Sequence, residues 1–520
     1  MLEILLLVGT IVFLYYVLVK PYDYWSKRNV QTGKIIPIFG DNIYLLLGKE
    51  CLADMLERIY SKMQNVRYFG GYQFMSPVLY LKSPDIIKQI CVKDFDHFMD
   101  RKGILPDDVE ELWSNTLFAL RGQPWKSMRS VLSPSFTSSK MKSMFTLLCH
   151  NADLFSKHFM KKPGNVIEVE FKDAFSRHAI DVIANTSFGL QVDSLEDRHN
   201  EFYLMGKEVA EFTTLRKKLT FFAYQLIPAI PKFLGISLFG ERPKNFFVNL
   251  VRETIKIREE QNIKRFDMLG LLIEARKGNE NEKSTNETSS TNEEQRAIDD
   301  AARQLSDMDI ASQVFVFFLG GFETVSTAMC FMAYELVANP DIQQKLIEEI
   351  DQNKPQKGAP SYETLNNMIY MEMVISETLR KWPINLAVDR VSTKPFTIEP
   401  KLPGEKPVHL EANTSIMIPA FSIQRDPQYY SDPEKFDPER FSPENRKNID
   451  PYTYIPFGIG PRNCIGLRFA LLEIKTVFFY ILSNFEIVPV EKTVIPLKIS
   501  RTSITLTSES GFTMGLKKRS

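Results

Sequence analysis

The chain lacks an excess of either charge, has few cysteines and has no visible internal repeat. Its 520 residues carry 64 Lys and Arg against 64 Asp and Glu, so the formal net charge is zero. A broad basic surface that would neutralise the phosphates of nucleic acids is therefore not expected. Hydrophobic residues make up 44% of the chain and charged residues 25%, which argues against the disordered, collagen-like and disulfide-stapled classes.

Cysteine is too sparse for most cysteine chemistry. Successive cysteines lie at least 40 residues apart, so no pair has the spacing of a zinc site, a redox CxxC motif or an iron–sulfur cluster. An odd, scattered set is typical of a reducing compartment. We expect most cysteines to be buried small hydrophobes, with Cys464 as the exception. The five are Cys51, Cys91, Cys149, Cys330 and Cys464.

The N-terminus begins with an uncharged apolar run from Ile4 to Val19, close to the ~20 residues that span a bilayer. The alternative is a cleaved signal peptide, but no small-residue cleavage site follows the run. Basic residues exceed acids behind it, and positive charge marks the cytosolic side. We expect residues 1–20 to be a single-pass anchor with the body in the cytosol. Tyr22, Tyr24 and Trp25 are expected to lie at the membrane interface.

The rest of the chain has a mainly helical pattern. Short strands are expected from Gly70 to Leu81, and helical periodicity dominates from Trp113 to Glu274. The interruptions are expected at Pro134, Pro163, Pro228, Pro231 and Pro243. Residues 278–296 contain no apolar residue and predict an exposed flexible loop. Because no clean linker divides the chain, we expect residues 21–520 to form a single domain, mainly α with a small β-rich region.

A long helix is expected after that loop. Ser306 to Asp309 has the spacing of a capping box, and Asn339-Pro340 should end the helix after about 33 residues, or ~50 Å. Further on, short β-rich pieces replace helices, for example Thr414 to Pro419 and Thr502 to Leu506. The aromatic stretch from Phe221 to Phe247 is interpreted as core packing, with ligand or membrane contact as the alternatives.

Residues 457–466, FGIGPRNCIG, present Cys464 on a tight loop before a helical run. Backbone N–H groups and the helix dipole favour a thiolate at such a position. The loop is not a dinucleotide fingerprint, because Asn463 stands where the third glycine belongs, and it is not a P-loop. A cysteine nucleophile would require a histidine base, and no histidine follows His409. A thiolate ligand to a metal cofactor remains.

This loop resembles the haem-binding loop of the cytochrome P450 family, pattern FxxGxRxCxG, and every fixed position from Phe457 to Gly466 matches. The resemblance implies the P450 fold, haem b as cofactor and Cys464 as the axial ligand of its iron. A cysteine thiolate pushes electron density onto haem iron and favours O–O cleavage.

Further motifs follow the family's order. Glu377 and Arg380 share a helix face and could be a solvated pair. In the family they form a buried cluster with the arginine of a PERF segment, here Arg440, and so have a structural role. Trp125 and Arg129, one helical turn apart, resemble the donors that bind haem propionates, with Arg462 as a further partner. Ala387 stands where a close relative would place arginine.

The motif Gly320-Gly321-Phe322-Glu323-Thr324 lies midway along the long helix. Without context it would indicate a kink at a helix crossing. The resemblance implies instead that Gly320 and Gly321 let the helix pass close to the haem. Glu323 and Thr324 then resemble the acid–alcohol pair that relays protons during oxygen activation, although Val325 stands where a second hydroxyl is common.

The resemblance covers the whole chain and is greatest to insect microsomal members that metabolise xenobiotics. It implies a monooxygenase of the endoplasmic reticulum membrane that inserts one oxygen atom from O₂ into lipophilic substrates. Electrons would come from NADPH through a separate reductase, with cytochrome b5 as a second donor. Lys126, Arg129 and Lys475 are expected to help the reductase dock. Plant toxins and insecticides are the expected substrates.

Two alternatives stay open. One is a haem-thiolate isomerase or dehydratase that uses a peroxide, and the other is a haem-dependent binding or sensing protein. Substrate contacts are expected from four segments by their position in the family: Ile104 to Leu120, Phe315 to Phe322, Asn385 to Val388, and Gly511-Phe512.

Overall fold

The computed structural model describes residues 1–103, 105–106, 109–210, 214–265, 267–277, 304–356, 358–503 and 505–519. The predicted loop at residues 278–296 lies outside them. The α-helices are α1 (Leu2–Leu18), α2 (Ile43–Leu46), α3 (Leu52–Ser61), α4 (Pro84–Lys88), α5 (Glu111–Ser114), α6 (Gly122–Leu132), α7 (Ser138–Met160), α8 (Phe171–Ile183), α9 (Glu201–Ala210), α10 (Leu215–Leu226), α11 (Ala229–Phe233), α12 (Glu241–Glu260), α13 (Met268–Lys277), α15 (Asp307–Ala338), α16 (Pro340–Asn353), α17 (Tyr362–Asn366), α18 (Ile369–Lys381), α19 (Ala420–Ile423) and α20 (Leu467–Asn484).

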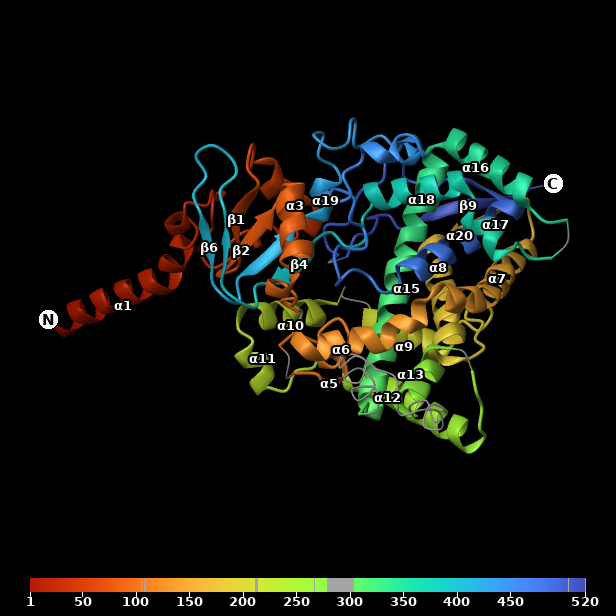
Figure 1. Ribbon diagram of the computed structural model, residues 1–520, viewed down its shortest axis with the longest axis horizontal. Coiled ribbons are helices and arrows are strands. Elements are labelled where there is room, and N and C mark those ends of the chain that lie inside the picture. The colour runs from red at the N-terminus through yellow and green to blue at the C-terminus, as the bar shows by residue number, and fades with distance from the viewer. Residues whose placement is uncertain are drawn as a thin grey trace, which may run out of the picture.

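Three small sheets accompany the helices, as the β-rich prediction required. The largest has the strand order β1-β2-β7-β4, and the others are β3-β9-β8 and β5-β6. The strands are β1 (Tyr68–Gln73), β2 (Ser76–Leu81), β3 (Val166–Glu170), β4 (Val388–Val391), β5 (Phe396–Ile398), β6 (Val408–Leu410), β7 (Ser415–Ile418), β8 (Phe485–Val488) and β9 (Thr513–Lys518). Figure 1 shows the four-stranded sheet at the end of the body from which α1 projects, with the helices gathered at the other end.

Helix α15 is the core of the helical part. Its predicted capping box is confirmed, because Ser306 accepts from the N–H of Asp309 while Asp309 accepts from the N–H of Ser306. The helix ends at Ala338, before Pro340 starts α16, as predicted. It is long and apolar enough to span a membrane, but 61% of its most apolar window is buried inside the protein. Figure 1 shows it crossing the body from α12 to α18.

The predicted interruption at Pro163 is confirmed, but the strand that follows it was not identified, and three other predictions about local structure were wrong. Strand β3 interrupts the helical stretch after Pro163, because it pairs with β9 at the far end of the chain. Pro231 and Pro243 do not interrupt helices but lie in the first turns of α11 and α12, where a missing N–H costs no hydrogen bond. No strand is present among the described residues of Thr502 to Leu506; the last strand is β9.

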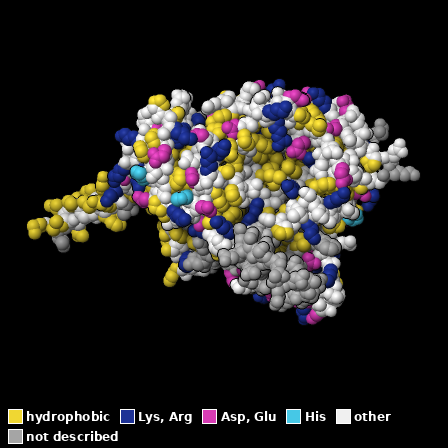
Figure 2. Space-filling model, in the orientation of Figure 1, with side chains coloured by type: hydrophobic (Ala, Val, Ile, Leu, Met, Phe, Trp, Pro, Cys, Tyr) yellow, Lys and Arg dark blue, Asp and Glu magenta, His cyan; other side chains and the backbone are white. Residues whose placement is uncertain are grey.

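The apolar N-terminal run forms α1, whose described side chains are exposed except for the half-buried Leu18, and Figure 2 shows it as a hydrophobic rod outside the body. This agrees with the predicted anchor. Trp25, however, does not project toward an interface, because its side chain is 0% exposed and lies inside the folded body.

Candidate functional site

The loop that carries Cys464 is fixed by its own backbone. The N–H of Cys464 donates to the carbonyl of Phe457 (2.9 Å), and the N–H of Asn463 donates to that of Gly460 (3.0 Å). Gly458 and Gly460 have φ of 72° and 76°, in the left-handed region that favours glycine. A Cβ on Gly460 would lie 2.0 Å from the carbonyl oxygen of Cys91. The loop is therefore pressed against the segment that follows α4.

Cys464 is the one cysteine with an exposed side chain, whereas the other four are buried, as predicted. Removal from bulk water raises the pKa of the Cys464 thiol, although the N–H of Gly466 and the guanidinium groups of Arg129 and Arg101 favour the thiolate. The backbone donor that we expected beside the thiolate is therefore present, and the loss of water opposes its effect. A metal cation would supply the missing positive charge, because coordination deprotonates a thiol.

Helix α15 presents an accessible strip in its middle. Gly320 and Thr324 are exposed and Val316 is half-buried, at successive i, i+4 positions of a mostly buried helix. A Cβ on Gly320 would meet nothing within 4 Å, whereas one on Gly321 would lie 2.9 Å from Ile183 of α8. The two predicted glycines thus differ: Gly320 faces open space, and Gly321 allows close helix packing.

Phe136 connects the strip to the cysteine loop. Its ring lies 5.5 Å from that of Phe317 on α15, and a Cβ on Gly466 would lie 3.9 Å from it. The accessible sulfur of Cys464 and the accessible strip of α15 therefore belong to the same region of the molecule. A flat cofactor held between helix and thiolate would need both surfaces in one region.

The predicted acid and alcohol point in different directions. The Thr324 hydroxyl donates to the carbonyl of Gly320, on the accessible strip. Glu323 instead lies 3.1 Å from the ammonium of Lys172 on α8. Lys172 also donates to Ser326 (3.0 Å) and Thr327 (2.7 Å). The sequence reasoning missed Lys172, because no local signal connects a lysine on α8 with an acid about 150 positions later.

Four arginines surround the cysteine loop. Arg129 donates to the carbonyl and side-chain oxygens of Asn463, both at 3.0 Å. Arg390 donates to the carbonyl of Ile459 (3.0 Å), and Arg101 contacts that of Arg462 (3.5 Å). Arg129 and Arg462 were predicted. Arg101 and Arg390 were not, although Arg390 lies three positions after the alanine where a close relative would place arginine.

Arg462 is 3% exposed, and its charged end lies against backbone carbonyls. It donates to the carbonyls of Met99, Phe118 and Leu120. Its guanidinium lies 4.6 Å from the ring of Trp125, so the structure brings this predicted pair together. Burial, reinforced by the like charges of Arg101 and Arg390, lowers the pKa of Arg462 to about 9.

The arginine cluster has more positive charge than its acidic neighbours balance. Among the described residues its ion pairs are with two carboxylates, Asp100 at 3.7 Å from Arg462 and Asp389 at 3.6 Å from Arg101. The buried ε-nitrogens of Arg390 and Arg462 have no hydrogen-bond partner within the part of the chain that the structure describes. Two further carboxylates would balance the charge and could use these donors. The two propionates of a haem meet both requirements, and the accessible cysteine supplies an iron ligand, so the residues present fit haem.

The structure brings together the three residues of the predicted structural cluster. Arg380 and Glu377 are both 0% exposed and joined by two hydrogen bonds of 2.7 and 2.9 Å. Arg440 lies 3.5 Å from the same carboxylate, and the N–H of Asp437 donates to it at 2.9 Å. Since each buried charge has partners, the cluster fixes the PERF segment on α18.

Gln424 extends this cluster to the cysteine loop. Its amide donates to the carbonyls of Leu379 and Arg380 and accepts from the N–H of Ile455, each at 2.9 Å. Ile455 precedes the loop by two residues and accepts from the N–H of Gly458. Gln424 therefore links α18 to the loop.

Other expectations are only partly met. Lys475 is 7% exposed and paired with Glu372 at 2.7 Å, so it offers no free charge to a partner. Arg129 is likewise occupied by Asn463, whereas Lys126 is exposed and pairs with the exposed Asp96 at 3.2 Å. The ring of Phe512 packs on Phe331 in the core, which leaves Gly511 as the exposed residue of that pair.

Comparison with known proteins agrees with this geometry. The sequence model of the family "Cytochrome P450" matches residues 31–514. Cytochrome P450 9e2 of Blattella germanica is 38% identical over 514 residues, covering 96% of this chain and 94% of that protein. "Probable cytochrome P450 9f2" of Drosophila melanogaster is 39% identical (96% and 95% covered), and cytochrome P450 3A18 of Rattus norvegicus 34% (96% and 95%). The chain belongs to the cytochrome P450 family of haem-binding monooxygenases.

Proposed function

We propose that this chain inserts one oxygen atom from O₂ into lipophilic xenobiotics such as plant toxins or insecticides. The second oxygen atom leaves as water, and two electrons come from NADPH through a separate reductase. The observation that carries the proposal is the pairing of an accessible Cys464 sulfur with the accessible strip of α15 that contains Thr324. We further propose that residues 21–520 form one catalytic domain and residues 1–20 its anchor.

The cofactor is proposed to be haem b, with Cys464 as the axial ligand of its iron. When bound, the haem supplies the binding and reductive cleavage of O₂, favoured by the thiolate. Arg101, Arg129 and Arg390 would hold its propionates together with Arg462. Trp125 would support Arg462 from behind through its ring. Phe457 fixes the loop through its carbonyl, which accepts from the N–H of Cys464.

Proton supply is assigned to α15. The Thr324 hydroxyl can turn from the Gly320 carbonyl and donate into the accessible space. Glu323 is half-buried and therefore reached by water. When protonated, the Glu323 side chain can leave Lys172 and pass its proton toward the Thr324 side of the helix. The ionised carboxylate then returns to the Lys172 ammonium. Gly320 keeps the helix surface open beside Thr324.

The strip on α15 favours lipophilic substrates. Val316 and Phe317 are half-buried apolar side chains beside Gly320, and Phe118 and Phe136 offer further apolar surface. Burial of apolar substrate area at such a surface contributes about 25 cal/mol per Å². No charged side chain is needed to hold a substrate of this class.

The reductase is proposed to dock on the face that carries the cysteine loop. Lys93, Lys126 and Arg468 are exposed on three segments next to it. Exposed charges steer association and are screened by salt. Replacing all three by Gln should raise the reductase concentration needed for half-maximal turnover and flatten its salt dependence. An unchanged salt dependence would count against this face; cytochrome b5 would compete for the same charges.

The endoplasmic reticulum membrane is the proposed location. Helix α1 supports it, and so do exposed apolar residues near α11, notably Ile230 (52%), Phe233 (90%) and Leu234 (60%). A patch of this kind is typical of a membrane or protein contact. The aromatic stretch from Phe221 to Phe247, which we interpreted as core packing, therefore contains both kinds of residue, because Phe247 is fully buried whereas Phe233 is exposed.

Turnover in reconstituted membranes tests the proposed function. The full chain, a P450 reductase, NADPH and a panel of lipophilic compounds should give products that contain one atom of oxygen from labelled O₂. Rearrangement or dehydration of an organic peroxide itself, without NADPH or O₂ and without oxygenation of the panel compounds, would indicate the isomerase or dehydratase class. Tight binding of the panel without any product would indicate a sensing protein.

A further inference from the structure

Trp25, seven positions after the end of α1, is built into the largest sheet. Its side chain is 0% exposed, and its indole N–H donates to the carbonyl of Gly71 on β1 at 3.0 Å. A Cβ on Gly70 would lie 2.4 to 2.8 Å from three ring atoms of Trp25. The ring therefore lies flat on the backbone of β1, where only glycine leaves room for it.

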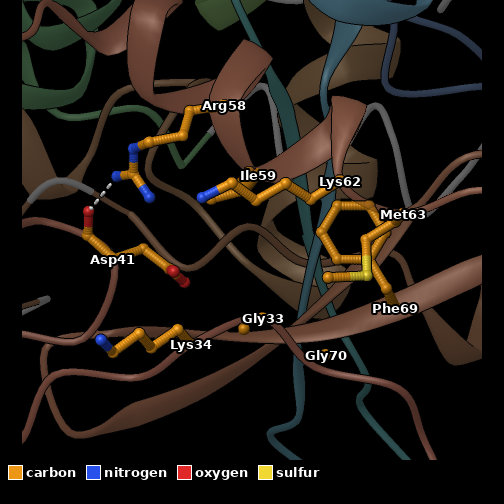
Figure 3. A pocket seen from close by; sticks show the side chains of 10 residues that line it. Gly33, Lys34, Asp41, Arg58, Ile59, Lys62, Met63, Phe69 and Gly70 are labelled. Carbon is orange, nitrogen blue, oxygen red and sulfur yellow. Dashed lines mark hydrogen bonds between the residues drawn. The ribbon is translucent and has the colours of Figure 1, made fainter.

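The opposite face of β1 is also closed. A Cβ on Gly71 would lie 2.6 Å from both a carboxylate oxygen of Asp41 and the ring of Tyr80. Figure 3 shows the small pocket beside this strand, lined by Gly70, Asp41 and Arg58 among others. Its free volume of about 20 Å³ suffices for one water molecule. The strand therefore has no room to move away from Trp25.

Neighbours on both sides of Trp25 are held as well. The ring of Tyr22 lies 4.9 Å from that of Tyr72, and its hydroxyl donates to the carbonyl of Phe74 (3.3 Å). Arg28 donates to Glu411 (2.5 Å) and to the carbonyl of His409 (3.3 Å). The segment thus contacts β1, the β1–β2 turn, β6 and the residue that follows β6.

Little chain is left between these contacts and the membrane helix. Helix α1 ends at Leu18, and a 3₁₀ helix from Lys20 to Asp23 begins two residues later with a proline at its start. Val19 between them has helical φ and ψ. A flexible tether would contain several residues without such structure.

We propose that residues 20–30 are a rigid joint that fixes the catalytic body at one tilt on the bilayer. The inference rests on the proposed membrane anchor. Because the joint holds the sheet next to α1, it keeps one end of the body against the lipid. Figure 1 places α11, with its exposed apolar residues, at that same end. The partner of this face is the bilayer surface.

The tilt of the bound haem in oriented phosphatidylcholine membranes tests the joint without any turnover. Linear dichroism of the full-length holoprotein should show one defined haem tilt. Gly70→Ala and Trp25→Ala should bring the signal close to isotropic while the protein stays on the membrane. Gly33→Ala is the matched control, because its Cβ would lie 3.6 Å from Met63 and displaces nothing; it should behave as wild type.

The outcomes separate the two proposals. Wild-type protein that fails to co-sediment with vesicles overturns the anchor, whereas membrane-bound wild type with an isotropic haem signal overturns the joint alone. A fluorescence test applies even if the disruptive variants fold poorly. The emission of Trp25 is the difference between the tryptophan fluorescence of wild type and that of Trp25→Phe. Lipids brominated near the carbonyl should not quench this difference. Quenching of that emission would place Trp25 in the bilayer and overturn the joint.

Discussion

Replacement of Gly458 or Gly460 by alanine distinguishes two effects of an added Cβ, the cost of a left-handed backbone and the clash with a neighbouring atom. Gly458 and Gly460 lie in one loop, with φ of 72° and 76°. An L-residue in this conformation costs about 1–2 kcal/mol, so both substitutions carry that cost. The two positions differ in the room available for the added Cβ. A Cβ on Gly458 would lie 3.9 Å from Asn463, whereas one on Gly460 would lie 2.0 Å from the Cys91 carbonyl oxygen.

Only the second contact requires the backbone to move. Real Cβ atoms essentially never lie under 3.0 Å from such an atom, and the obstacle at Gly460 is backbone rather than a flexible side chain. Gly460→Ala must therefore shift the loop away from Cys91 and disturb the hydrogen bond between Cys464 and Phe457. Gly458→Ala keeps the loop in place and loses no more than the torsional cost.

The assay is haem content per polypeptide and the red-shifted Soret band of the reduced carbon-monoxide complex, with the unfolding midpoint alongside. Gly458→Ala should keep both spectral properties and unfold a few degrees lower at most. Gly460→Ala should lose haem or lose the red-shifted band. Equal behaviour of the two variants would refute the argument, because torsion alone would then decide the effect.

The remaining predictions concern the ligand, the relay and pH. Cys464→Ser should abolish the red-shifted Soret band, and its survival would refute the ligand assignment. Thr324→Ala should use NADPH without forming product, measured as the product-to-NADPH ratio, and an unchanged ratio would exclude the relay role. Burial raises the pKa of Asp181 from 3.8 to about 7, so the folded state holds its proton more tightly and loses stability as pH rises between these values. The free energy of unfolding of Asp181→Asn, measured in urea, should therefore rise relative to that of wild type by about 2–3 kcal/mol from pH 5 to pH 8. A difference that does not change with pH would contradict the raised pKa.

Features set by local sequence were predicted well. The capping box of α15 needs only Ser306 and Asp309, and the loop around Cys464 depends on glycines within ten residues. The pair of Glu377 and Arg380 follows from helical spacing, although its burial came from the family resemblance. Such elements carry their determinants within one or two turns of chain.

Features set by long-range contacts were missed. Strand β3 pairs with β9, which lies near the other end of the chain, so no local pattern distinguishes it from the helices around it. Lys172 and Glu323 meet through the packing of α8 on α15. Trp25 follows an apolar run and looked like an interface residue, but the glycines that receive it lie about 45 positions later. Each case requires knowledge of which segments meet.

The arginine cluster connects cofactor binding with the stability of the fold. Arg101, Arg390 and Arg462 are contributed by segments far apart in the chain, and their like charges oppose one another within a region that has little water. Two carboxylates offset only part of this charge. Any group that binds the folded state alone stabilises it, and two propionates would neutralise what remains. The same contacts that would hold the haem would therefore hold β4, the segment before α5 and the cysteine loop together, so that a substitution such as Arg390→Leu should weaken haem retention and folding in parallel.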